Sequence, residues 1–254
     1  MTILSNDGLL STALWIFENN WPLFWYGVKI TLLLSTLGTL FGLVIGLIFG
    51  GIRAIEVEEK DKAAVKVVKK VLHAFVAFYV WFFRGTPMMV QAMFFYYGLR
   101  PILGWTPNIA GIAIISVNTG AYMCEIIRSG IQSVDKGQVE AARSLGMTST
   151  QTMMYIVLPQ AIRNSFPSIG NEFIVNIKDS SMLNVIGVIE LYFQTTSVAG
   201  TMMLFTETFF ITCIIYLLLT SVAMMILTTI EKRMNMPKTS FPASQTVPTK
   251  AGDR

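Results

Sequence analysis

The chain has 254 residues, of which 53% are hydrophobic and 13% are charged, and its mean hydropathy is +0.58. Soluble globular domains are about one quarter charged, so this composition argues against a soluble enzyme or binding domain and places the chain in a bilayer. The formal net charge of +4 comes from basic residues that flank apolar segments, so we interpret them as membrane-topology signals and expect no nucleic-acid partner.

The first predicted membrane span covers residues 23–51 and follows an expected extracytoplasmic segment, residues 1–22. A helix needs about 20 apolar residues to cross the hydrocarbon core, and Lys29 is the only charged residue in this run. Glycine recurs every fourth residue, at Gly38, Gly42, Gly46 and Gly50. Such a stripe lets another helix approach closely. That helix could belong to this chain, to a second copy or to a paralogous subunit.

The second predicted span covers residues 65–98 and is broken by the sequence RGTP, Arg84 to Pro87. If the break were an external turn, residues 88–98 would be too short to cross the membrane, and every later loop would change sides. One long broken span instead places the basic segments 53–70, 128–163 and 232–238 together on the cytoplasmic side. A helix broken at membrane depth is tolerated where protein or a water-filled cavity covers the freed backbone, so RGTP should face the interior.

Three more spans are predicted at residues 109–127, 166–192 and 203–230. The expected fold is therefore an all-α membrane protein with five transmembrane helices, the N-terminus outside and the C-terminus in the cytoplasm. The transmembrane unit covers residues 23–233. The remaining tail, residues 234–254, is rich in Pro, Ser and Thr, and we expect it to be disordered.

The sequence VEAARSLGMTSTQTMMYIVLPQ, residues 139–160, separates the third and fourth spans and predicts two short cytoplasmic helices. Gly146 is expected to end the first helix in a left-handed turn. Thr148 and Gln151 have the spacing of a capping box for the second helix. Pro159 suits the first turn of the next membrane helix. Helices this short are not stable alone in water, so the protein's own cytoplasmic ends or a partner must hold them.

This segment resembles the cytoplasmic loop of ATP-binding-cassette importer permeases. The matching residues are Glu140, Ala141, Ala142, Gly146, Ile156, Leu158 and Pro159. Residues 83–99, 120–142 and 170–187 resemble the polar-amino-acid branch of these permeases, and the likeness extends over residues 23–233. The resemblance implies that the loop forms a coupling helix that docks on an ATPase subunit. The residues expected at that contact are Glu140, Ala141, Ala142, Leu145, Gly146, Leu158 and Pro159.

The resemblance also implies a multi-pass protein of a prokaryotic plasma membrane. Its implied partners are two ATPase subunits, an extracytoplasmic solute-binding protein and a second permease, either a copy or a paralogue. The chain itself has no phosphate-binding loop of the form GxxxxGK[ST]. We therefore expect a non-catalytic subunit without a cofactor or metal of its own, with ATP and Mg²⁺ used by the partner ATPase.

Polar residues within the predicted spans suggest a substrate pathway, because such residues are costly in a membrane. Helical spacing places Glu172, Asn176 and Asp179 on one face of the fourth span. The full predicted pathway comprises Arg84, Thr86, Gln91, Asn118, Tyr122, Glu172, Asn176 and Asp179. Arg84 suits an α-carboxylate, and the two acidic residues suit an α-ammonium or a cationic side chain. This balance favours basic or neutral polar amino acids over acidic ones.

An alternative interpretation is that Arg84, Glu125, Glu172, Lys178 and Asp179 neutralise one another as structural pairs. We favour that interpretation for Glu125, near the cytoplasmic end of its span. The predicted function is the membrane-spanning subunit of an ATP-driven importer of polar amino acids. An ion-coupled transporter or channel, with Glu125, Glu172 and Asp179 as a proton relay, is the alternative that would act without an ATPase. A membrane-embedded enzyme is disfavoured, because the chain has a single histidine, His73, and no paired cysteines.

Overall fold

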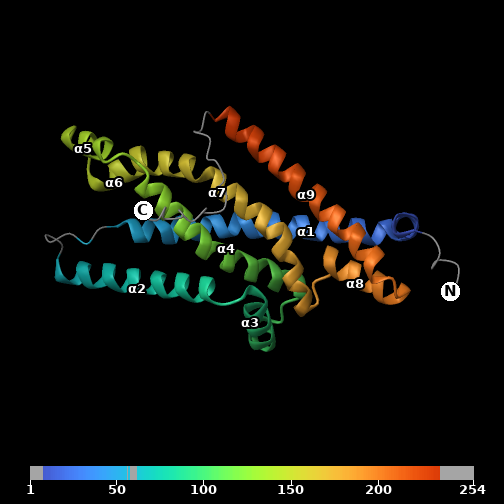
Figure 1. Cartoon of the computed structure of the whole chain (residues 1–254). Coiled ribbons are helices and arrows are strands. Elements are labelled where there is room, and N and C mark those ends of the chain that lie inside the picture. The colour runs from blue at the N-terminus through green and yellow to red at the C-terminus, as the bar shows by residue number, and fades with distance from the viewer. Residues whose placement is uncertain (1–7, 56, 58–61, 235–254) are drawn as a thin grey trace, which may run out of the picture.

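The computed structural model describes residues 8–55, 57 and 62–234, which form helices joined by short connections (Figure 1). The elements are α1 (Leu9–Ala54), α2 (Ala63–Gly85), α3 (Met88–Leu103), α4 (Pro107–Gln132), α5 (Lys136–Ser144), α6 (Ser149–Thr152), the π-helix η1 (Met153–Val157), α7 (Leu158–Asp179), the 3₁₀-helix η2 (Ser180–Ile186), α8 (Leu191–Met202) and α9 (Phe205–Arg233). Within these residues the all-α expectation is confirmed.

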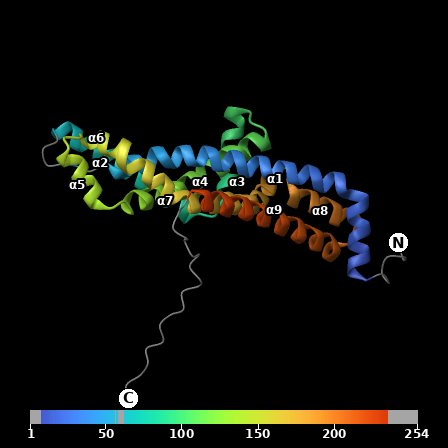
Figure 2. The ribbon, with the colours of Figure 1, turned by 90° about the horizontal axis from the view of Figure 1, so that it is seen from above.

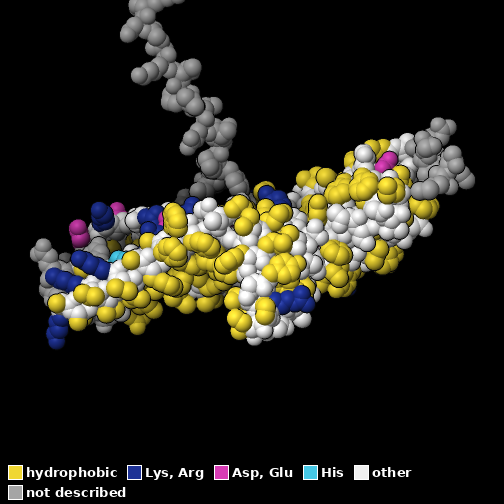
Figure 3. Space-filling view, turned by 90° about the horizontal axis from the view of Figure 1, so that it is seen from below, with side chains coloured by type: hydrophobic (Ala, Val, Ile, Leu, Met, Phe, Trp, Pro, Cys, Tyr) yellow, Lys and Arg dark blue, Asp and Glu magenta, His cyan; other side chains and the backbone are white. Residues whose placement is uncertain are grey.

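Among the described helices, α1, α4 and α9 are long and apolar enough to cross a membrane. Large apolar side chains are exposed over much of the surface in Figure 3, while Lys and Arg gather mainly toward the end where α2 begins. The short helices α5 and α6 lie at that same end (Figure 1). The count of five spans and their orientation stay predictions.

The glycine stripe of α1 packs against α4 within the same chain. A Cβ atom added at Gly38, Gly42, Gly46 or Gly50 would lie between 2.3 and 3.0 Å from a side chain of α4. The four side chains that it would meet are Ile115, Thr119, Met123 and Ile127, again one every fourth residue. The helix that packs on the stripe therefore belongs to this chain.

The break in the second predicted span lies where the sequence placed it. Helix α2 ends at Gly85, Thr86 is extended, and Pro87 precedes α3, which turns away from the axis of α2 in Figure 1. The amide of Gln91 donates to the carbonyl oxygens of Phe83 and Thr86 at 3.0 and 2.9 Å, and to Thr86 Oγ1 at 2.7 Å. This one buried side chain thus donates to two of the carbonyl groups at the break.

Helix α1 begins at Leu9 and passes through Pro22 without ending, so one helix contains residues of both the expected N-terminal segment and the first expected span. The extracytoplasmic assignment of residues 1–22 stays a prediction. Figure 2 shows α1 bent near its N-terminal end, as expected from the hydrogen bond that a proline removes. The expected fourth span at residues 166–192 is wrong at its C-terminal end, because α7 stops at Asp179 and Gly187 turns the chain with a φ of +83°. The predicted tail beyond Met234 lies outside the described residues.

Candidate functional site

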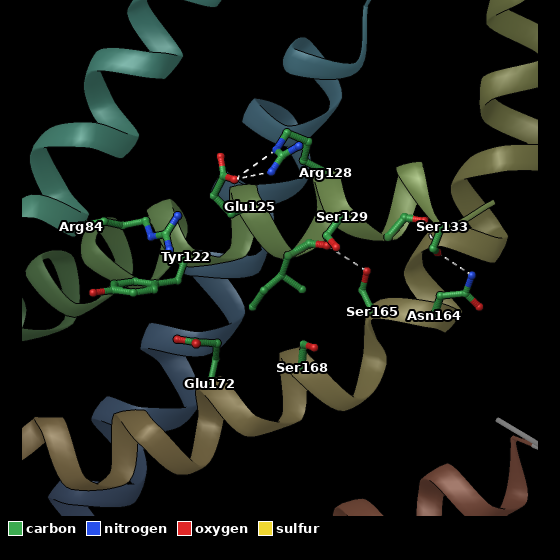
Figure 4. Close-up of a pocket in the computed structure, with 12 residues that line it drawn as sticks. Arg84, Tyr122, Glu125, Arg128, Ser129, Ser133, Asn164, Ser165, Ser168 and Glu172 are labelled. Carbon is green, nitrogen blue, oxygen red and sulfur yellow. Dashed lines mark hydrogen bonds and ion pairs between the residues drawn. The ribbon is translucent and has the colours of Figure 1, made fainter. Parts of the chain in front are cut away.

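Two polar cavities lie around the break between α2 and α3. The first, called the α4–α7 cavity, has a volume of about 490 Å³. It is lined from α4 by Tyr122, Glu125 and Arg128 and from α7 by Ser168 and Glu172, while Arg84 of α2 closes one end. Figure 4 shows Ser168 and Glu172 pointing from α7 toward α4, while Glu125 and Arg128 pair with each other on the side of α4 that faces away from α7. Tyr122 and Ser133, at opposite ends of the lining, are separated by about 16 Å of helix.

The second cavity, called the break cavity, has a volume of about 340 Å³. It is lined by the break residues Gly85, Thr86 and Pro87, and by Asn118 and Asp179 from α4 and α7. Arg84 and Tyr122 line both cavities. The Arg84 guanidinium lies over the Tyr122 ring, 5.3 Å from its centroid, which is a cation–π geometry.

Glu125 is held by two arginines at the edge of the α4–α7 cavity. Its carboxylate accepts hydrogen bonds from Arg128 Nε and Nη2, at 3.1 and 2.8 Å, and forms an ion pair with Arg53 at the end of α1. Glu125 is therefore a structural pair, as favoured, but its ion-pair partners are Arg53 and Arg128 and not the predicted Arg84 or Lys178. The arrangement ties α1 to α4 at the end of the molecule that carries α5.

The short helices between α4 and α7 form a capped hairpin, called the α5–α6 hairpin, over residues 135–152. Asp135 Oδ1 accepts a hydrogen bond of 2.7 Å from the backbone of Gly137 and caps α5. Gly146 has a φ of +82°, and both hydrogen bonds of the Thr148–Gln151 capping box are present. The expected left-handed turn and capping box are confirmed.

The hairpin presents part of its predicted contact set to the outside. Glu140, Ala141, Gly146 and Pro159 are exposed, and 85% of Leu145 is exposed. Leu158 is half-buried and Ala142 is buried, so these two residues face the chain itself. Pro159 lies in the first turn of α7, but it opens no separate helix, because η1 runs into α7 without interruption.

The sequence profile of the family described as the inner membrane component of binding-protein-dependent transport systems matches residues 62–236. The chain belongs to this family.

Individual relatives agree over most of the permease. The glutamine transport system permease protein GlnP of Escherichia coli K12 is 35% identical over 218 residues, which are 85% of this chain and 94% of that protein. The probable amino-acid permease protein YxeN of Bacillus subtilis 168 is 34% identical over 233 residues, covering 90% and 99% of the two chains. A crystal structure of an amino acid ABC transporter with histidines matches with a TM-score of 0.74 and 35% identity, covering 90% of this chain and 99% of that chain. Family membership gives this protein a transport role.

The permease brings six of its eight predicted pathway residues to the two cavities. Arg84, Tyr122 and Glu172 line the α4–α7 cavity, and Arg84, Thr86, Asn118, Tyr122 and Asp179 line the break cavity.

Gln91 and Asn176 are absent from the lining of both described cavities. Gln91 supports the break, and its Oε1 accepts a hydrogen bond of 2.9 Å from Asn118. Asn176 accepts from Thr119 at 3.0 Å and donates to Thr39 at 2.9 Å, which joins α7 to α4 and α1. These two residues hold the walls in place.

Sequence reasoning missed the hydroxyl and amide side chains of the α4–α7 cavity. Those residues are Ser129, Ser133, Asn164, Ser165 and Ser168. Small polar residues also serve close helix packing in membranes, so they carry little signal by themselves. Ser165 shows both uses, because its hydroxyl donates to the Ile126 carbonyl at 3.2 Å while Gly130 leaves room for it. Their helical spacing could have revealed them, because Ser129 and Ser133 share a helix face with Tyr122, and Ser165 and Ser168 share one with Glu172.

Glu190 was also missed, because it falls inside the residues assigned to the fourth span. Its side chain is completely buried. The carboxylate caps α8 by accepting from the backbone of Tyr192 and Phe193 at 2.8 and 2.7 Å, and from the Tyr216 hydroxyl at 3.1 Å. These partners supply the hydrogen bonds that a buried carboxylate needs. Because they lie at the start of α8 and in α9, Glu190 joins the two helices.

Proposed function

We propose that this permease is the membrane-spanning subunit of an ATP-driven importer of polar amino acids. The observation that carries this proposal is the distribution of opposite charges around the two cavities, with Arg84 shared by both cavities, Glu172 across the first and Asp179 in the second. A guanidinium can bind an α-carboxylate through two parallel hydrogen bonds. The acidic residues then suit the α-ammonium or a cationic side chain. The names of GlnP and YxeN support an amino acid as the substrate.

Two carboxylates beside one shared guanidinium favour a basic or neutral polar substrate. Glu125 with Arg53 and Arg128 carries one net positive charge, but these three side chains are paired with one another at the edge of the α4–α7 cavity and do not line the break cavity with Asp179. An acidic substrate would bring a second negative charge toward Glu172 and Asp179, and like charges in a poorly solvated site repel strongly. The proposed substrates are therefore amino acids such as glutamine, histidine and arginine.

We further propose that the α5–α6 hairpin is the contact for the ATPase. Its exposed Leu145 and Ala141 offer apolar and small surfaces to a groove, and Glu140 adds a charge at the rim. ATP and Mg²⁺ act on that partner, a solute-binding protein delivers the substrate from outside, and a second permease, identical or paralogous, completes the membrane core. The chain then lies in the plasma membrane of a prokaryote with α5 in the cytoplasm.

The test is uptake in proteoliposomes that contain the permease, its ATPase and its solute-binding protein. Glu172→Gln and Asp179→Asn keep side-chain size and remove the charge, so each should raise the substrate concentration for half-maximal uptake by about tenfold or more. Glu207→Gln is the matched control, because Glu207 lies in α9 outside the lining of both cavities. Unchanged half-maximal concentrations in both cavity variants would contradict the binding role.

The same preparation separates the proposal from an ion-coupled transporter. That alternative uses Glu125 as a proton carrier, a role opposed by its ion pairs with Arg53 and Arg128. The importer should show no uptake when the ATPase or ATP is omitted. Full uptake without nucleotide, abolished by an uncoupler, would refute the ATP-driven function.

A further inference from the structure

The two cavities meet at one pair of side chains. Arg84 and Tyr122 are the only residues that line both of them within the described chain. Arg84 comes from the last turn of α2 and Tyr122 from the middle of α4, so the pair bridges two helices. The pair therefore lies at the boundary that the two cavities share.

The backbone around the pair is fixed, while the Arg84 side chain has room to move. Gln91 holds the carbonyl groups of Phe83 and Thr86, and Asn118 also donates to Phe83 at 3.3 Å. Arg84 itself is exposed, and a Cβ atom added at neighbouring Gly85 would meet nothing within 4 Å. Rotation of the Arg84 side chain therefore requires no rearrangement of the buried core.

The contact that holds Arg84 is of a kind that a substrate can replace. In the described part of the structure, the Tyr122 ring is its direct partner, at 5.3 Å from the ring centroid. Glu125 is already bound by two arginines. Figure 4 shows Glu172 on the opposite helix, separated from Arg84 by the cavity. A carboxylate that forms two charge-assisted hydrogen bonds binds a guanidinium more strongly than an aromatic ring does.

We propose that Arg84 and Tyr122 form a barrier between the α4–α7 cavity and the break cavity, which opens when the carboxylate of a substrate draws the guanidinium away from the ring. The identity of the substrate rests on the proposed function, but the barrier does not. The barrier makes an α-carboxylate a condition for passage. Arg84 thereby determines specificity for an amino acid over the corresponding amine, which has the same side chain and ammonium group but no carboxylate.

Site-directed labelling tests the barrier without measuring transport. Exposed Cys213 is replaced by serine, and buried Cys124 is kept. One cysteine is then introduced in each cavity, as Ser168→Cys in the α4–α7 cavity and Met182→Cys in the break cavity. The full-length permease and its ATPase are placed in sealed membrane vesicles. A membrane-impermeant thiol reagent is added on the side of the α5–α6 hairpin.

With the pair intact, Ser168→Cys should react and Met182→Cys should be protected. Replacing Tyr122 by leucine should raise the labelling rate of Met182→Cys by about tenfold, and Arg84→Gln should have the same effect. Tyr122→Phe keeps an aromatic face and should keep the protection. Tyr97→Leu removes an exposed tyrosine of neighbouring α3, outside both cavities, and is the matched control. Labelling of Ser168→Cys reports that each variant is folded in the membrane.

Two results would overturn the barrier. One is rapid labelling of Met182→Cys with the pair intact, and the other is protection that persists in both Tyr122→Leu and Arg84→Gln. A mixture of basic and neutral polar amino acids should accelerate labelling, whereas the corresponding amines without a carboxylate should not. Equal acceleration by both sets, or by neither, refutes the role of the carboxylate. Absence of ATP-dependent uptake would refute the proposed function and leave these labelling results unaffected.

Discussion

The tight contact between α1 and α4 gives a prediction whose magnitude follows from interatomic distances. In Gly46→Ala, the new Cβ atom would lie 2.3 Å from Met123 Cβ and 2.8 Å from the Met123 carbonyl carbon. Neither atom can rotate away, so the two helices must separate. Overpacking costs about 1–3 kcal/mol, and backbone involvement places this site near 3 kcal/mol. Alanine returns about 1 kcal/mol of helix propensity.

The expected net loss for Gly46→Ala is therefore about 2 kcal/mol, which lowers the melting temperature of a chain of this size by about 4–8 °C. Size-exclusion chromatography of heated, detergent-solubilised protein measures this shift. Gly51→Ala is the control in the same helix, because a Cβ atom at Gly51 meets nothing within 4 Å. That variant should melt at or slightly above the temperature of the parent protein. Equal melting temperatures for the two variants would refute the argument that α1 and α4 leave no space at Gly46.

Three further predictions concern other elements. Gln91→Leu leaves the Thr86 carbonyl without its side-chain donor and removes one of the two donors to the Phe83 carbonyl. It should therefore lower the free energy of unfolding by about 2–3 kcal/mol, and a melting temperature equal to that of the parent would contradict this. Glu190→Ala removes the cap of α8 and the partner of the Tyr216 hydroxyl, so we expect a loss of about 2–4 kcal/mol in the same assay. A loss no larger than that of the half-buried control Glu207→Ala would count against this. Leu145→Asp should keep the melting temperature of the parent, since surface substitutions usually change stability by less than about 0.5 kcal/mol. The same variant should no longer co-purify with the ATPase. Retention of the ATPase would argue against docking at the α5–α6 hairpin.

Features set by neighbouring residues were predictable from the sequence. The α5–α6 hairpin depends on Gly146 and on the pair Thr148 and Gln151, which are three residues apart. The break depends on Pro87, which also restricts the residue before it. In each case the physical cause and its effect lie within one turn of helix, so the local pattern is sufficient.

Features that depend on distant residues were not predictable. Arg53 reaches Glu125 across 72 positions of sequence, and no spacing pattern connects them. Helical periodicity places Asn176 on the same broad face as Glu172, but only the positions of α1 and α4 show that it meets Thr39 and Thr119. The end of α7 was misplaced because the residues after it are apolar, and average hydropathy does not detect a turn such as that at Gly187.

The continuity of α6, η1 and α7 has a mechanical consequence. From Ser149 to Asp179 the backbone is helical at every residue, although Figure 4 shows α7 changing direction between Asn164 and Ser168. Pro167 lacks one backbone hydrogen bond near the middle and is the most compliant point. Because the helix is continuous across this point, a displacement of the short helices is transmitted through the backbone toward Glu172 and Asp179.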